Sequence, residues 1–70
     1  GGAGYRLLAE TVIALNGFNP QMAARMLGPL TGWRKFDPKY GAAMQAALQM
    51  ILDSGELSPD VFEVVTKTLA

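Results

Sequence analysis

The chain has 70 residues, half of them hydrophobic, and its six basic and six acidic side chains give a formal net charge of zero. That balance lacks the electropositive surface typical of a nucleic-acid-binding domain. The absence of cysteine and histidine excludes disulfides and thiolate metal sites, and it removes the commonest metal ligand and general base. We therefore expect at most one small domain, with no catalytic residue and no metal or other cofactor of its own.

The start of the chain shows no targeting pattern. No uninterrupted apolar run approaches the length of a membrane span, and the first residues lack the charged, apolar and cleavage regions of a signal peptide. We expect no membrane partner and a cytoplasmic location. Gly1 and Gly2 are expected to form a loop or to be a remnant of cloning.

Three helix-capping side chains are each followed directly by proline, at Asn19-Pro20, Asp37-Pro38 and Ser58-Pro59. The side-chain oxygen can accept a hydrogen bond from a first-turn amide, and proline at the first helical position loses no helical bond. Gly17 and Gly55 precede two of these starts and suit the left-handed position that ends a helix. The pattern predicts an all-α chain of about four short antiparallel helices, at about residues 4–16, 20–28, 38–53 and 59–69.

Two of the predicted helices contain a residue that weakens a helix. We expect a break or kink near Gly28-Pro29, because an interior proline loses a hydrogen bond and clashes with the preceding turn. Gly41 lies inside the predicted helix 38–53, where glycine costs about 1 kcal/mol relative to alanine. We expect the first turn of that helix to fray.

The apolar faces of the predicted helices become narrower along the chain. Helix 4–16 is apolar on nearly all sides, whereas helix 59–69 has its apolar residues, Phe62 among them, on one side and its charges on the other. A helix that is apolar all round needs several neighbours, and a one-sided helix needs one. This gradient predicts the C-terminal end of an α-solenoid of armadillo or HEAT type, with a compact four-helix domain as the alternative.

An aromatic and basic cluster lies between the second and third predicted helices, at Trp33, Arg34, Lys35, Phe36 and Lys39. Three positive charges on a neutral chain make a poor track for phosphates. We expect a packed turn with Trp33 and Phe36 inward and the cations outward, and no nucleic-acid partner.

Five segments in order carry a resemblance to a known family: GYRLLA at 4–9, NPQMAAR at 19–25, WRKFD at 33–37, MQAAL at 44–48, and LSPDVFEVV at 57–65 through the terminal Leu69-Ala70. They resemble the extreme C-terminus of the bacterial aminopeptidase N family, the zinc-dependent alanyl aminopeptidases of the M1 peptidase family. The resemblance implies a superhelical stack of paired helices that closes over a catalytic domain. It places the zinc-binding H-E-x-x-H motif far upstream, in a parent that removes N-terminal residues from peptides.

If the resemblance holds, this chain is a non-catalytic fragment that walls the substrate chamber, and zinc belongs to the parent alone. Its partners would be the upstream catalytic domain of the same polypeptide and the C-terminus of a bound peptide. The alternative function is a free-standing helical interaction module that offers a hydrophobic groove to a partner helix. A small enzyme built on carboxylates such as Glu10 or Glu63 has only the presence of these acids in its favour.

Arg25 is the residue we single out, because it is the only charge between Glu10 and Arg34. It has two interpretations. It is a structural arginine bonded to helix ends or to a carboxylate such as Glu10, since an unpaired buried guanidinium is costly. Alternatively it faces the enclosed cavity beside Gln21 and holds the C-terminal carboxylate of a peptide. The resemblance favours ligand contact, because the family has an arginine at the matching place after Asn-Pro-Gln.

Overall fold

The computed structural model describes residues 2–70, and within this range it contains helices and no strand. Its elements are α1 (Gly2–Asn16), α2 (Pro20–Arg25), the 3₁₀ turns η1 (Gly28–Leu30) and η2 (Trp33–Lys35), α3 (Pro38–Leu52) and α4 (Pro59–Leu69). The expected all-α class is confirmed. Gly2 belongs to α1 and not to a loop, while Gly1 lies outside the described residues.

The three proline-flanked helix starts form as the sequence predicts. Asn19 Oδ1 accepts a hydrogen bond from the amide of Met22 at 3.3 Å. Asp37 Oδ1 and Ser58 Oγ accept the equivalent bonds at the starts of α3 and α4, at 3.2 and 3.3 Å. Each of these helices has proline in its first turn. Local capping therefore determines where three of the four helices begin.

The second predicted helix is interrupted earlier than expected. Helix α2 ends at Arg25 and not at residue 28, and the chain then tightens into 3₁₀ geometry. The amide of Leu27 bonds to the carbonyl of Ala24, and the amide of Leu30 bonds to the carbonyl of Leu27. The physical reason is Pro29, whose nitrogen has no hydrogen to donate to the preceding turn.

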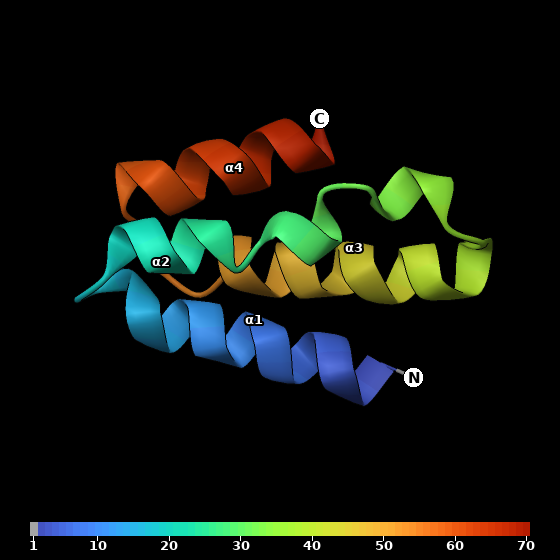
Figure 1. Cartoon of the computed structure of the whole chain (residues 1–70), viewed down its shortest axis with the longest axis horizontal. Coiled ribbons are helices and arrows are strands. Elements are labelled where there is room, and N and C mark those ends of the chain that lie inside the picture. Colours follow the sequence, from blue (N-terminus) through green and yellow to red (C-terminus); the bar gives the residue numbers. More distant parts are fainter. Residues whose placement is uncertain (1) are drawn as a thin grey trace.

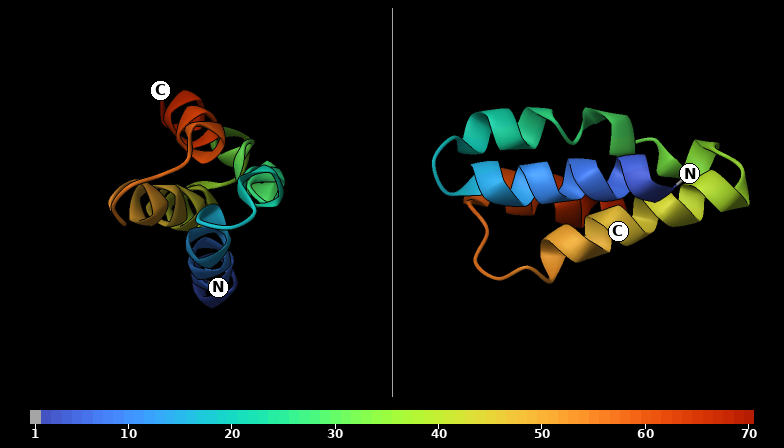
Figure 2. Two further views of the ribbon diagram at one scale, coloured as in Figure 1. Left: turned by 90° about the vertical axis from the view of Figure 1, so that its left-hand side faces the viewer. Right: turned by 90° about the horizontal axis from the view of Figure 1, so that it is seen from below.

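The four helices form two hairpins that stack on each other. Consecutive helices run in opposite directions (Figure 1). Helix α1 packs against α2 and α3, and α4 packs against the same two helices. Seen end on, α1 and α4 therefore lie at opposite corners of the arrangement (Figure 2). The hairpin α1–α2 stacks on the hairpin α3–α4, which is the neighbour-on-neighbour packing of a helical repeat protein.

The core lies where the two hairpins meet. Its largest fully buried side chains are Leu27, Leu30, Met44, Leu48, Ile51, Val12, Val61 and Val65. Each α-helix and η1 contributes at least one fully buried residue to the core. The contribution of α2 is Ala23. No polar or charged side chain of residues 2–70 is buried. Apolar packing between hairpins thus holds this part of the chain together.

Gly41 allows a close approach between η2 and α3, and the expected frayed first turn is wrong. Gly41 is buried inside α3, which is helical from Pro38 onward. A Cβ atom at this position would lie 3.0 Å from the carbonyl oxygen of Trp33. The missing side chain therefore lets the backbone of η2 rest on the helix. Glycine lowers the helix propensity at this position, but its missing Cβ permits the contact between η2 and α3.

The two helix-ending glycines behave differently. Gly55 has a φ of +128°, the only positive φ among residues 2–70, as its predicted role requires. The prediction for Gly17 is wrong, because the chain stays right-handed there. The amides of Phe18 and Asn19 both bond to the carbonyl of Leu15, so the α1 turn continues past Gly17 without a left-handed residue.

Large apolar side chains remain exposed on all four α-helices or beside them. Leu7 of α1 is 64 % exposed, in line with the expected uncovered side of that helix. Tyr40 is also exposed. Phe62 of α4 is half exposed, so its predicted place on the packed side is wrong. It directly follows the buried Val61 and therefore points about 100° away from the core.

Candidate functional site

Gln21 and Arg25 lie on the outer face of α2, both exposed to solvent. They are four residues apart, which places them one above the other on the same face of the helix. Ala23, on the inner face, is fully buried against the core. The helix is fixed in position by the Asn19 cap at one end and by the 3₁₀ bonds that follow Arg25 at the other. This face is the candidate site.

Arg25 has no protein partner within residues 2–70. The carboxylate of Glu10, offered by the structural interpretation, instead lies 3.7 Å from Arg6 Nε, one turn away on α1. No hydrogen bond joins the side chain of Arg25 or of Gln21 to another group in this part of the chain. The guanidinium and the amide are therefore available to a ligand or to protein outside these residues.

A second polar cluster, which the sequence did not reveal, ties η2 to the end of α4. Arg34 Nη1 donates to the carbonyl of Thr68 at 2.9 Å, and Nη2 donates to the carbonyls of Leu69 at 3.1 Å and Ala70 at 2.8 Å. Trp33 Nε1 donates to the same Thr68 carbonyl at 3.1 Å. The guanidinium carbon lies 4.3 Å from the centroid of the indole ring. Arg34 thus caps α4 with a planar cation, which suits the negative end of the helix dipole.

A third polar contact ties the end of α1 to the loop before α4. Asn16 Nδ2 donates to the carbonyl of Glu56 at 3.1 Å, and Asn16 Oδ1 accepts from the amide of Ser58 at 2.8 Å. One side-chain amide therefore satisfies both a donor and an acceptor of the loop backbone. Helix α4 is held at its start by Asn16 and at its end by Arg34.

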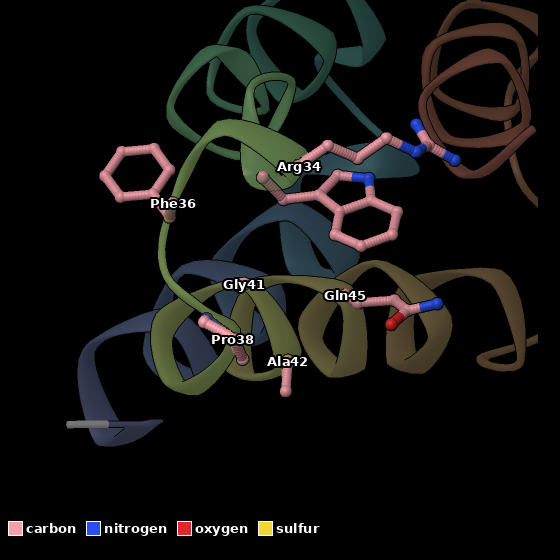
Figure 3. Close-up of a pocket in the computed structure, with 7 residues that line it drawn as sticks. Arg34, Phe36, Pro38, Gly41, Ala42 and Gln45 are labelled. Atoms are coloured by element: carbon pink, nitrogen blue, oxygen red, sulfur yellow. The ribbon is translucent and has the colours of Figure 1, made fainter.

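A groove of about 320 Å³ lies between η2 and the first half of α3 (Figure 3). It is lined by Trp33, Arg34, Phe36, Pro38, Gly41, Ala42 and Gln45. The expected inward packing of Phe36 is wrong: its side chain is 51 % exposed and points away from α3 (Figure 3). Its backbone is extended and leads directly into the Asp37 cap, so the carbonyl, and not the ring, faces α3 near Gly41. The lining contains no acid or base aimed at a reacting atom.

The donor set of this chain does not fit a zinc site. Catalytic zinc is held by histidine, cysteine and carboxylate ligands, and the sequence has neither of the first two. Within residues 2–70, no three acidic side chains gather where they could hold a metal ion. We derive no chemical step through a metal from these residues.

The helices of the described part are all too short or too polar to cross a membrane.

Comparisons with known proteins agree with this architecture. Residues 1–70 match the family model described as "Domain of unknown function (DUF3458_C) ARM repeats". The chain is 43 % identical over 68 residues to aminopeptidase N of Caulobacter vibrioides, covering 97 % of the chain and 8 % of that protein. It is 41 % identical over 69 residues to aminopeptidase N of Escherichia coli, covering 99 % of the chain and 8 % of that protein.

The corresponding protein of Haemophilus influenzae is 41 % identical over 68 residues, which covers 97 % of the chain and 8 % of the relative. The matched segment is C-terminal, as the resemblance in the sequence indicates. The ARM-repeat description also confirms the expected solenoid end. The chain spans less than a tenth of the length of these curated relatives.

Proposed function

The chain belongs to the family of ARM-repeat domains that matches residues 1–70, and we propose that it is the non-catalytic C-terminal part of a longer peptidase that removes N-terminal residues from peptides. The observation that carries this proposal is the ordered match of nearly the whole chain to three aminopeptidases N. The rest of the same polypeptide is then its first partner. Catalytic zinc, where the longer protein binds it, is held by upstream residues.

The uncovered face of α1 supports docking of a preceding helical repeat. Leu7 is 64 % exposed, although α1 already packs against two helices. In a repeat protein each hairpin buries the apolar face of the next, and a hairpin at one end of the described stack leaves that face open. We therefore propose that an upstream hairpin of the longer polypeptide covers α1.

The outer face of α2 supports a wall of the substrate chamber. Gln21 and Arg25 are exposed, and neither side chain has a hydrogen-bond partner within residues 2–70. Arg25 is the only charge between Glu10 and Arg34, so no neighbouring acid in that stretch competes for it. A carboxylate accepts two parallel hydrogen bonds from a guanidinium. We propose that Arg25 holds the C-terminal carboxylate of a bound peptide and that Gln21 bonds to its backbone.

Kinetics of the longer enzyme test this proposal. With a tripeptide that has a free carboxylate, Arg25→Ala should raise KM about tenfold or more, the loss expected for hydrogen bonds between charged groups. With the same tripeptide as its C-terminal amide, Arg25→Ala should change KM little. If the variant affects both substrates equally, or shifts only the melting temperature, Arg25 is structural. The 70-residue chain by itself should release no alanine from alanyl-nitroanilide, whereas turnover would contradict the non-catalytic role.

A cytoplasmic location is also part of the proposal. Fractionation of cells that produce the longer polypeptide tests it directly.

A further inference from the structure

Two exposed apolar side chains, Phe18 and Met22, lie in the same stretch of sequence as Gln21 and Arg25, and we call them the apolar shoulder. Phe18 is 77 % exposed and Met22 is 49 % exposed. Phe18 precedes the Asn19 cap, and Met22 lies in the first turn of α2 beside Gln21. The α1–α2 turn and the start of α2 lie together at one end of the molecule, at the left of Figure 1. Phenyl, thioether, amide and guanidinium groups therefore follow one another along this short stretch.

The charge of this stretch indicates what it binds. Between Glu10 and Arg34 the chain carries no acidic residue and one basic residue, Arg25. Packing this face against an ordinary apolar surface would strip the guanidinium of water without giving it a partner, which is costly. A complementary ligand must supply both an apolar group and a carboxylate. This requirement favours a peptide chain end over the apolar side of another helix.

The spacing suits a single terminal residue. Met22 and Arg25 are three residues apart, a rise of about 4.5 Å along the helix axis. One residue of an extended peptide spans about 3.5 Å. A terminal residue with its carboxylate at Arg25 can therefore place its own side chain over Met22, and Phe18, four residues before Met22, is the next exposed large apolar side chain in this stretch. The flexible thioether of methionine adapts to apolar side chains of different shapes.

We infer that the apolar shoulder sets the preference for the C-terminal side chain of the peptide, favouring peptides that end in a large apolar residue over peptides that end in a polar one. This inference rests on the proposed function, because it takes Arg25 as the carboxylate ligand. It adds two specificity residues, Phe18 and Met22.

The longer enzyme is assayed with three substrates: Ala-Ala-Leu, Ala-Ala-Ser and Ala-Ala-Leu amide. The variants are Met22→Gln, which keeps the length of the side chain but makes it polar, Phe18→Ser and Arg25→Ala. Phe36→Ser is the matched control, because Phe36 is also an exposed phenylalanine but belongs to the groove beside α3. Melting temperatures of all variants separate binding effects from unfolding.

The longer enzyme without substitutions should show a lower KM for Ala-Ala-Leu than for Ala-Ala-Ser. Met22→Gln and Phe18→Ser should each reduce that KM ratio about threefold to tenfold, as expected from partial burial of one apolar side chain, and Phe36→Ser should leave it unchanged. The inference about the apolar shoulder alone is overturned by two results together. The KM ratio stays unchanged in both shoulder variants, and Arg25→Ala still removes the preference for the free carboxylate over the amide. If Arg25→Ala also leaves that preference unchanged, the proposed function of the α2 face fails with it.

Discussion

The substitution Gly41→Ala tests whether position 41 requires glycine because the backbone of η2 packs closely against it. In the interior of a helix the change from glycine to alanine is worth about 1 kcal/mol of added stability. At Gly41 the new Cβ would lie 3.0 Å from the carbonyl oxygen of Trp33, which is well inside ordinary van der Waals contact. Overpacking of this kind costs about 1–3 kcal/mol. We expect Gly41→Ala to be neutral or destabilising by up to about 2 kcal/mol.

Gly4→Ala is the matched control. Gly4 also lies within an α-helix, and a Cβ built there would meet no atom within 4 Å. This variant should gain stability from helix propensity, by an amount reduced because Gly4 is near the start of α1. The stability difference between the two variants reflects the clash with Trp33 less the unequal gain in helix propensity, and it should be up to about 3 kcal/mol. For a chain of this size each 1 kcal/mol shifts the melting temperature by about 4–8 °C.

Thermal unfolding followed by far-ultraviolet circular dichroism measures both variants against the parent chain. If Gly41→Ala stabilises the chain as much as Gly4→Ala does, the backbone of η2 is free to move away, and the proposed reason for the glycine is wrong.

Two further predictions concern the polar contacts that hold α4. Arg34→Ala should cost about 1–2 kcal/mol in denaturant melts and speed amide exchange in the last turn of α4, because the carbonyls of Leu69 and Ala70 lose their donor and that of Thr68 keeps only Trp33 Nε1. Arg34→Lys should recover only part of this, since an ammonium cannot reproduce the planar fork, and Lys35→Ala should have no effect on that turn. Asn16→Ala should cost about 1–3 kcal/mol by leaving the amide of Ser58 and the carbonyl of Glu56 unpaired. Asn16→Asp should cost less if the bond to Ser58 dominates, because it retains the acceptor.

The helix starts were predictable because their causes are local. Asn19, Asp37 and Ser58 each bond to an amide three residues ahead, so the cap and its target lie in the same short stretch of sequence. The effect of Pro29 is equally local, although the α-helix ends three residues before the expected position. Gly17 shows the limit of such reasoning, because right-handed bonds to Leu15 satisfy the turn without the left-handed conformation that glycine permits.

The contacts that hold α4 could not be read from the sequence. Arg34 bonds to carbonyls 34 to 36 residues away, and Asn16 bonds to backbone 40 and 42 residues away. Nothing near either residue marks such a partner, because the partner groups are backbone atoms that every residue carries. The same holds for Gly41, whose role depends on a carbonyl of η2 brought to it by the fold.

The candidate site was predictable in part. Sequence alone isolated Arg25 as the one charge in a long neutral stretch and placed Gln21 on the same face. It could not show that Glu10 is engaged by Arg6 instead. Helical periodicity alone also places Met22 on the apolar arc of its helix, whereas 49 % of that side chain remains exposed. Helical periodicity gives the angle of a residue but not which angles the neighbouring helices cover.

The two outer helices of the described stack, α1 and α4, can be compared by the polar contacts at their ends and by the apolar side chains that they leave exposed. Asn16 bonds to the amide of Ser58 just before α4, and Arg34 bonds to the carbonyls of the last three residues, Thr68 to Ala70. Both outer helices leave a large apolar side chain exposed, Leu7 at 64 % on α1 and Phe62 at 51 % on α4. A further hairpin could therefore bury apolar surface at either outer helix. The segment that this chain matches is C-terminal in the longer relatives, so we propose the α1 side as the place where a preceding hairpin packs.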